Sequence, residues 1–256
     1  MTAPGPRWES PPNRFVLPRT EAHVWRAGLA PDTERAARFL PSLSADERER
    51  AERFARAPDR ERFILGRGAL RSLLGRYLDR DPKQIEFSYG RYGKPALAGS
   101  AAGALVFNVS HSRDLALFVL VRGRQVGIDL EFLREGVACQ RIAARFFSRA
   151  EAADLAGVPA ADETRAFFNC WTRKEAYLKA RGEGILADLD NFTVSLRPEE
   201  PAALRHSDRG AGEAARWQLA ALDPGPGYVG ALCVEGSGWT AGYFDWPAAA
   251  RDLPGA

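Results

Sequence analysis

The chain contains few of the residues that build disulfide frameworks or zinc sites. Among its 256 residues are three cysteines, Cys139, Cys170 and Cys233, which lie far apart and form no CxxC motif. There are also only three histidines, and no two of them stand at the spacing of metal ligands. Sparse cysteines of odd number are typical of free thiols in a reducing compartment. We therefore expect a cytoplasmic protein without a cysteine–histidine zinc site.

Long apolar runs and a large net charge are missing as well. No run approaches the ~20 apolar residues of a membrane helix. The Pro-rich N-terminus has no apolar signal-peptide core. A net charge of +3 is too small to predict binding to nucleic acid or to a membrane surface. The hydrophobic content of 45% instead predicts a globular protein of one large domain or two small ones.

Lysine is the scarce basic residue. Only four of the 36 lysines and arginines are lysine, namely Lys83, Lys94, Lys174 and Lys179. Lysine carries a compact charge that suits end-on contact with phosphate or carboxylate. We interpret Lys94, Lys174 and Lys179 as ligand-binding side chains; the alternative is codon bias with accidental placement.

A predicted helix over residues 167–184 carries a carboxylate on its apolar face. Phe168, Trp171, Glu175 and Leu178 share one face at helical spacing. A buried charge needs a cation, a metal or a proton, and Lys179 can share that face. The helix is expected to end at Gly182 or Gly184. The alternative is a core helix with one Glu175–Lys179 ion pair.

Two further carboxylates share one face of a predicted strand over residues 125–132. Asp129 and Glu131 would lie roughly 6.5 to 7 Å apart along the strand and would repel each other unless a cation sits nearby. With Glu175 they form a set of three hard oxygen donors, which suits Mg²⁺ or Mn²⁺. The alternative is the solvent face of an edge strand.

The order of predicted elements occurs twice, before and after about residue 130. Helices are expected at 31–40, 44–57, 63–78, 141–147 and from 148 onward, and strands at 23–25, 85–89, 105–110, 115–121, 125–132, 192–196, 217–222, 228–234 and 240–244, with a polar loop at 198–212. This pattern predicts two similar α+β halves packed around a shared cleft. The parts of the chain would be a flexible Pro-rich lead (1–20), an N-terminal half (21–130) and a C-terminal half (131–256).

Arginines between residues 46 and 81 are interleaved with acids, which favours a solvated helix face over a nucleic-acid groove. Some of them could still serve one small polyanionic ligand.

Ser110 and His111 are adjacent, which could suggest a hydrolase nucleophile and base. On a strand these side chains point to opposite faces, and no Gly-x-Ser-x-Gly motif is present, so we reject that interpretation.

Five segments occur in an order that resembles the Sfp-type 4′-phosphopantetheinyl transferases, including those of cyanobacteria. They are Gly93-Lys94-Pro95, 107–112 (FNVSHS), 127–131 (GIDLE), 146–151 (FFSRAE) and 171–179 (WTRKEAYLK). The match covers about residues 40–196, and five motifs in order are far more specific than any one of them. The resemblance implies a pseudo-twofold fold of two similar halves with coenzyme A bound between them.

The same resemblance implies a reaction and its residues. A Mg²⁺ ion on Asp129, Glu131 and Glu175 would bridge to the coenzyme A pyrophosphate, and Lys179 would stabilise charge. The 4′-phosphopantetheine group would move to a serine of an apo carrier protein, with release of adenosine 3′,5′-bisphosphate. Either Glu151 or Glu175 would be the base.

The coenzyme A contacts implied by the resemblance come from both halves. Ser110, His111, Lys174 and Lys179 would meet phosphate groups. Gly93, Lys94 and Pro95 would pack at the adenine and 3′-phosphate end, and Arg50 and Arg62 would meet the 3′-phosphate. One departure is Glu47, at a position where some relatives carry lysine.

Two other functions fit parts of the pattern. An inactive coenzyme A-binding scaffold would keep the fold without turnover, and a Mg²⁺-dependent nuclease would use the same carboxylates but would need a basic groove. For the transferase we expect a monomer. Its carrier protein would dock over residues 134–161.

Overall fold

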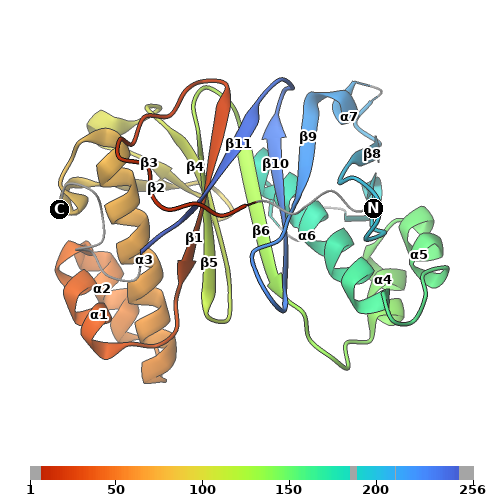
Figure 1. The fold of residues 1–256 in the computed structure, drawn as a ribbon, viewed down its shortest axis with the longest axis horizontal. Coiled ribbons are helices and arrows are strands. Elements are labelled where there is room, and N and C mark those ends of the chain that lie inside the picture. The colour runs from red at the N-terminus through yellow and green to blue at the C-terminus, as the bar shows by residue number, and fades with distance from the viewer. Residues whose placement is uncertain (1–6, 185–188, 211, 248–256) are drawn as a thin grey trace.

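The computed structural model describes residues 7–184, 189–210 and 212–247 and has an α+β fold, which confirms the predicted fold class. Two β-sheets form the centre of the molecule, with helices outside each of them (Figure 1). The first sheet has the order β11 (Thr240–Asp245), β1 (Glu21–Gly28), β5 (Leu115–Val121), β4 (Val106–Ser112). The second has the order β6 (Val126–Phe132), β10 (Tyr228–Glu235), β9 (Trp217–Leu222).

The helices form two groups on opposite sides of the paired sheets (Figure 1). Beside the first sheet lie α1 (Thr33–Phe39), α2 (Ala45–Glu52) and α3 (Ala57–Leu78). Beside the second lie α4 (Cys139–Phe146), α5 (Arg149–Ala156) and α6 (Glu163–Arg181), and the short α7 (Glu213–Arg216) precedes β9. Two small hairpins, β2 (Phe87–Tyr89) with β3 (Pro95–Leu97) and β7 (Phe192–Val194) with β8 (Leu204–Ser207), complete the fold. No helix of the described chain combines the length and apolar composition that crossing a membrane requires.

Side-chain alternation explains why β5 is an unbroken apolar run. Phe118 and Leu120 pack into the cluster beneath α3, whereas Leu117 and Val119 pack into the layer between the two sheets. A strand buried on both faces needs an apolar residue at every position. In β6, Ile128 joins the layer between the sheets, so the opposite face of β6 is left for contact with α6.

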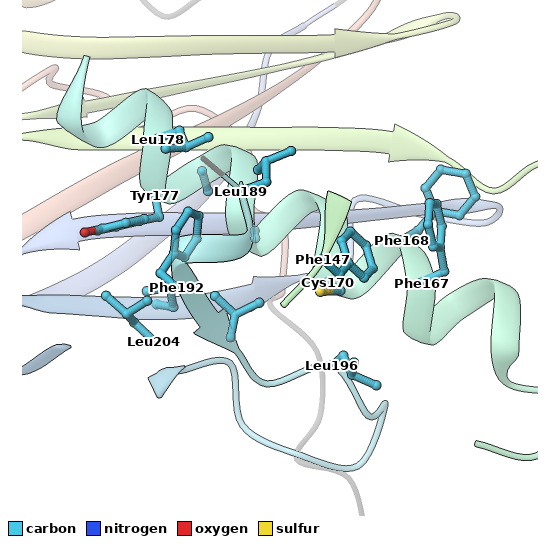
Figure 2. Packing of buried hydrophobic residues seen from close by; sticks show 14 of the residues in the cluster. Phe147, Phe167, Phe168, Cys170, Tyr177, Leu178, Leu189, Phe192, Leu196 and Leu204 are labelled. Carbon is cyan, nitrogen blue, oxygen red and sulfur yellow. The ribbon is translucent and has the colours of Figure 1, made fainter. Parts of the chain in front are cut away.

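Helix α6 lies directly against that face of β6. A Cβ atom on Gly127 would lie 2.1 Å from the carbonyl oxygen of Ala176 and 2.3 Å from the amide nitrogen of Ala180. The other side of α6 is anchored in the core of the C-terminal half, where Phe147 stacks on Phe167 with ring centroids 5.3 Å apart (Figure 2). The helix ends at Gly182 in a left-handed conformation with φ of 73°, one of the two predicted ends.

The two halves meet where β4 faces β6, and side chains join these strands. Three side-chain oxygens of β4 accept hydrogen bonds from backbone N–H groups of β6. The pairs are Asn108 Oδ1 with Ile128 N–H at 2.9 Å, Ser110 Oγ with Leu130 N–H at 3.2 Å, and Ser112 Oγ with Phe132 N–H at 3.1 Å. Within the described chain, β4 and β6 belong to different sheets. Alternate polar side chains of β4 thus satisfy backbone groups that a neighbouring strand would otherwise satisfy.

The predicted boundary at residue 130 does not separate the two sheets. β6 begins before that boundary and pairs with β10, while β11 returns from the C-terminal half to pair in parallel with β1.

The described part of the N-terminal lead differs from the flexible segment that was expected. Trp8 donates its indole N–H to the Asp223 carbonyl at 2.8 Å, and Phe15 stacks on Trp25. Residues 1–6 lie outside the described residues.

Three other element predictions were wrong in detail. The helix expected over 44–57 ends at Glu52, and α3 begins at Ala57, earlier than expected, with Pro58 in its first turn. The predicted polar loop 198–212 contains β8, where Thr193 pairs with His206 across the hairpin. A four-residue strand stabilised by this pairing carries too short a pattern to be read locally.

We expect Gly127→Ala to lower the free energy of unfolding by about 1 to 3 kcal/mol, because the added methyl group would overlap the backbone of α6. Equilibrium urea unfolding measures the change. Gly28→Ala is the matched control, since this strand glycine has nothing within 4 Å of its Cβ position. Equal unfolding midpoints for the two variants would contradict the close packing of α6 on β6.

Candidate active site

Two adjoining cavities open where β4 faces β6. The smaller, of about 290 Å³, is lined by residues of β4, β6 and α6. The larger, of about 960 Å³, is lined mainly by α2, α3, β4, β5 and the β2–β3 hairpin. Val109 and His111 line both, so the cavities meet at β4. Carboxylates line the smaller cavity and arginines the larger, which makes one cleft with an anionic end and a cationic end.

The structure brings the predicted carboxylates and Lys179 together in the smaller cavity. Asp129 is 5% exposed and Glu175 is 3% exposed, so the alternative of a solvent-facing edge strand is wrong for Asp129. The Lys179 ammonium lies 2.5 Å from Asp129 Oδ1 and donates to Ser110 Oγ at 3.1 Å. Lys179 therefore pairs with β6, and in the described chain no ion pair joins it to Glu175.

Burial and mutual repulsion make this cavity costly for negative charge. The pKa of Glu175 is raised to about 7, first by burial and then by the Asp129 charge, with Lys179 opposing the rise. The pKa of Glu131 is raised for the same two leading reasons. Carboxylates that are desolvated and close to one another favour the arrival of a proton or a cation.

Two carboxylate oxygens in the cavity have the character of cation ligands. Asp129 Oδ2 and Glu175 Oε1 are buried and accept no hydrogen bond. Over the residues described, however, no group of three or more histidine, cysteine, aspartate or glutamate side chains is arranged to hold a metal ion. Mg²⁺ usually takes one or two protein carboxylates and completes its shell with water and substrate phosphates. The donors present fit that pattern, because both unpartnered atoms are hard oxygens.

Ser110 and His111 have different surroundings although they are adjacent. Ser110 Oγ donates to Asp129 Oδ1 at 2.8 Å and thereby orients this carboxylate. His111 lines the junction of the two cavities. His111 is exposed at the cleft surface, and the pKa of its imidazole is lowered, first by partial desolvation from neighbouring protein atoms and then by the charges of Lys179 and Arg50. The imidazole of His111 can thus offer a hydrogen-bonding group to a ligand at the junction.

The two predicted arginines in the larger cavity differ in their pairing. Arg62 donates to Asp114 Oδ1 at 2.8 Å and to Asp59 Oδ1 at 3.0 Å, so carboxylates already neutralise its charge. Arg50 is exposed and lies 5.2 Å from the ring centroid of Phe63, and no salt bridge to it is found in the part of the chain described. Arg50 therefore has the more available guanidinium.

Arg67 also lines this cavity, and sequence reasoning missed it. Its Nη1 atom is buried without a hydrogen-bond partner, and its Nε lies 3.4 Å from Glu47 Oε1. Glu47, the departure from the family pattern, is 2% exposed and also binds Arg71 at 2.6 Å. The acid thus turns inward and orients arginines of α3. Arg67 lies four residues after Phe63 and four before Arg71. This helical spacing could have placed Arg67 on the same face of α3 as those two residues.

The Gly93-Lys94-Pro95 motif is split between two environments. Gly93 and Pro95 line the larger cavity. The Lys94 ammonium turns away and donates to the carbonyl oxygens of Val126 and Lys179, at 3.1 and 2.6 Å. The predicted contact between the Lys94 amine and phosphate is at odds with this geometry, because backbone carbonyls occupy its donors.

Glu151 and Lys174 lie outside both cavities. Both residues are 0% exposed, and Lys174 Nζ lies 2.7 Å from Glu151 Oε2. Lys174 also donates to the carbonyl oxygens of Leu189 and Phe192, while Glu151 accepts the Val194 N–H and closes the capping box at the start of α5. The pair ties α5 and α6 to β7. This placement is at odds with a base at Glu151 and with a coenzyme contact at Lys174.

Comparison with known proteins identifies similar chains. The family described as the 4′-phosphopantetheinyl transferase superfamily matches residues 125–233, and the family of N-terminal 4′-phosphopantetheinyl transferase regions matches residues 28–121. The 4′-phosphopantetheinyl transferase HetI of a Nostoc species is 40% identical over 93% of this chain and 98% of its own. The 4′-phosphopantetheinyl transferase Sfp of Bacillus subtilis is 30% identical over 77% of this chain and 84% of its own.

The raised pKa of Glu175 predicts a pH-dependent stability in the metal-free protein. Between pH 4.5 and about 7 the folded state keeps a proton that the unfolded state has lost, so the free energy of unfolding falls as pH rises, by up to roughly 3 kcal/mol. Glu175→Gln should remove this contribution and be the more stable protein at pH 8. Urea unfolding of both proteins in EDTA at pH 5 and pH 8 tests this, and a pH-independent difference between them would contradict it.

Proposed function

The chain belongs to the 4′-phosphopantetheinyl transferase superfamily, and we propose that its two-part cleft binds coenzyme A and transfers the 4′-phosphopantetheine group to a serine of an apo carrier protein. The members of this family use coenzyme A as the group donor. The observation that carries the proposal is the arginine-lined cavity that opens into a buried set of carboxylates with one lysine. A polyanionic nucleotide fits the first part, and a phosphoryl transfer fits the second.

In this proposal the nucleotide end of coenzyme A occupies the larger cavity. Arg50 and Arg67 would hold the 3′-phosphate. Arg50 has no salt bridge in the described chain, and Nη1 of Arg67 has no hydrogen-bond partner. Gly93 and Pro95 would pack against the adenine. Arg62 would contribute less, since Asp59 and Asp114 already bind it. The pyrophosphate would then lie at the junction, beside His111 and Lys179.

Asp129 and Glu175 would hold the divalent cation, Mg²⁺ or Mn²⁺. Glu131, which already accepts a hydrogen bond from Ser112, would add negative charge beside them. The cation would neutralise the pyrophosphate oxygens and the acidic cavity together. This assignment is supported by the unpartnered oxygens of Asp129 and Glu175 and by their burial. Ser110 would keep Asp129 in place through its 2.8 Å hydrogen bond.

Lys179 and Glu175 would perform the proton and charge work of the transfer. The serine oxygen attacks the phosphorus that carries the pantetheine arm, and the bond from that phosphorus to the bridging oxygen breaks. Adenosine 3′,5′-bisphosphate leaves with the electron pair of that bond, and the Lys179 ammonium stabilises its charge. Of the two candidate bases, Glu175 would take the serine proton, because it lines the smaller cavity whereas Glu151 does not.

Carrier protein and coenzyme A are the partners of this function. A reducing cytoplasm would suit the three cysteines, which are buried free thiols. We expect a monomer because one chain carries both halves of the cleft.

An inactive coenzyme A-binding scaffold is the second candidate function. The carboxylates Asp59 and Asp114 on the wall of the larger cavity make a nuclease groove a poor fit.

We expect an apo acyl carrier protein incubated with this protein, coenzyme A and Mg²⁺ to gain the mass of one phosphopantetheine. Intact-protein mass spectrometry measures the gain, which should be absent with EDTA and reduced at least 100-fold in rate for Glu175→Gln. Glu199→Gln is the matched control, because Glu199 is exposed, lines neither cavity and lies outside the segment 134–161 expected to meet the carrier. Binding of coenzyme A without transfer to any of several unrelated carriers would favour the scaffold.

Arg67→Ala should raise the KM for coenzyme A roughly tenfold, as expected for the loss of a charged hydrogen bond to phosphate. The KM for 3′-dephospho-coenzyme A should change less than twofold, because that substrate lacks the group that Arg67 would bind. Arg60→Ala is the control, since Arg60 is an exposed residue of α3 outside the cavity. Equal losses for both substrates would place Arg67 elsewhere than at the 3′-phosphate.

A further inference from the structure

The tip of the β2–β3 hairpin has two faces with different surroundings. On one face, Tyr89, Gly93 and Pro95 line the larger cavity. From the other face, the Lys94 ammonium reaches the C-terminal half and donates to the Lys179 carbonyl at 2.6 Å. The tip is therefore both a wall of the proposed nucleotide site and an anchor on the other half of the molecule.

A second contact joins the same tip to the segment that follows α6. A Cβ atom on Gly184 would lie 2.7 Å from Cδ1 of Tyr92, so the tyrosine ring rests directly on the Gly184 backbone. The carbonyl of Ala180 also faces Lys94, at 3.4 Å. The last carbonyls of a helix lack intrahelical partners and carry partial negative charge, which makes this a favourable place for an ammonium group.

Lys179 connects this contact to the acidic cavity. Its backbone carbonyl accepts the Lys94 hydrogen bond, while its side-chain ammonium binds Asp129 at 2.5 Å and Ser110 at 3.1 Å. The tip itself is a tight turn, in which the Gly90 N–H donates to the Lys94 carbonyl at 2.9 Å and Gly93 has φ of 78°. A displacement of Gly93 by a ligand would therefore carry Lys94 with it.

We propose that Lys94 is a positioning residue that couples occupancy of the arginine-lined cavity to the placement of the Lys179 ammonium. The inference rests on the proposed function for the identity of the ligand, but the coupling itself depends only on the contacts of Lys94, Tyr92 and Lys179. Through them, the nucleotide end of the substrate would influence the group that stabilises the leaving phosphate.

Lys94→Met tests the coupling, because methionine keeps much of the side-chain length but donates no hydrogen bond. We expect kcat/KM for coenzyme A to fall at least tenfold, with a higher KM and a lower kcat, measured at a temperature where circular dichroism shows the variant folded. Lys94→Gln should recover part of the loss, since its amide can still donate. Lys83→Met is the control, because Lys83 is an exposed lysine of the same half. A purely structural role would lower the melting temperature and leave kcat unchanged.

Hydrogen exchange supplies a readout that does not require turnover. In the wild-type protein, coenzyme A should slow amide exchange in residues 90–95 and also in 179–184; in Lys94→Met it should slow exchange in 90–95 alone. Wild-type kinetic constants in Lys94→Met, or protection of both segments in that variant, would overturn the coupling.

Two further results separate this inference from its premise. No transfer by the wild-type protein would count against the proposed function, and the exchange pattern would still decide the coupling. If Lys94→Met does not fold, Tyr92→Ala removes the second contact of the tip. Tyr92 is 55% exposed, so the fold should tolerate the change. We expect it to weaken protection of 179–184, and unchanged protection would argue against the coupling.

Discussion

The close approach of α6 to β6 is the constraint on which the cleft depends. Because Gly127 has no side chain, the helix backbone lies directly on the strand. This contact places Glu175 in the same cavity as Asp129 and Glu131, away from bulk water. Such an arrangement opposes folding, since desolvated carboxylates repel one another. The apolar core on the other side of α6, visible in Figure 2, supplies the stabilisation that offsets this repulsion.

The junction between the halves determines how the two cavities communicate. Three polar side chains of β4 bind successive outward amides of β6, and two of them, Ser110 and Ser112, also bind Asp129 and Glu131. The residues that join the halves are thus the residues that orient the acidic cavity. Lys94 adds a further connection, from the hairpin of one half to the helix of the other. The cleft is therefore part of the interface that holds the molecule together.

Much of the fold and part of the candidate site could be predicted from the sequence. β5, β6 and α6 follow from local periodicity. Glu175 follows from a carboxylate on an apolar helix face, and Asp129 and Glu131 follow from two carboxylates on one face of a strand. Local patterns do not specify partners that are distant in sequence. Lys94 was expected to meet phosphate, whereas its ammonium binds carbonyls 32 and 85 positions away.

Glu151 also shows that a local pattern does not specify a tertiary partner. Its Ser-x-x-Glu spacing predicted a helix start, and the structure has a capping box there. The same carboxylate was also considered as a base, although a buried partner, Lys174, occupies it. Arg67 was missed because the inward turn of Glu47, which orients it, is a tertiary contact 20 positions along the chain.

The parallel pairing of β11 with β1 has a consequence for the order in which the protein can be completed. The ribosome makes β1 near the beginning and β11 near the end, yet the two are neighbours in one sheet. Until residues 240–245 have been synthesised, the outer edge of β1 lacks its partner strand, and the first sheet is unfinished although most of its own half already exists. β11, the last described strand, thus completes the sheet that contains β1, the first strand. A nascent chain therefore acquires its complete N-terminal sheet only after the C-terminal half has emerged.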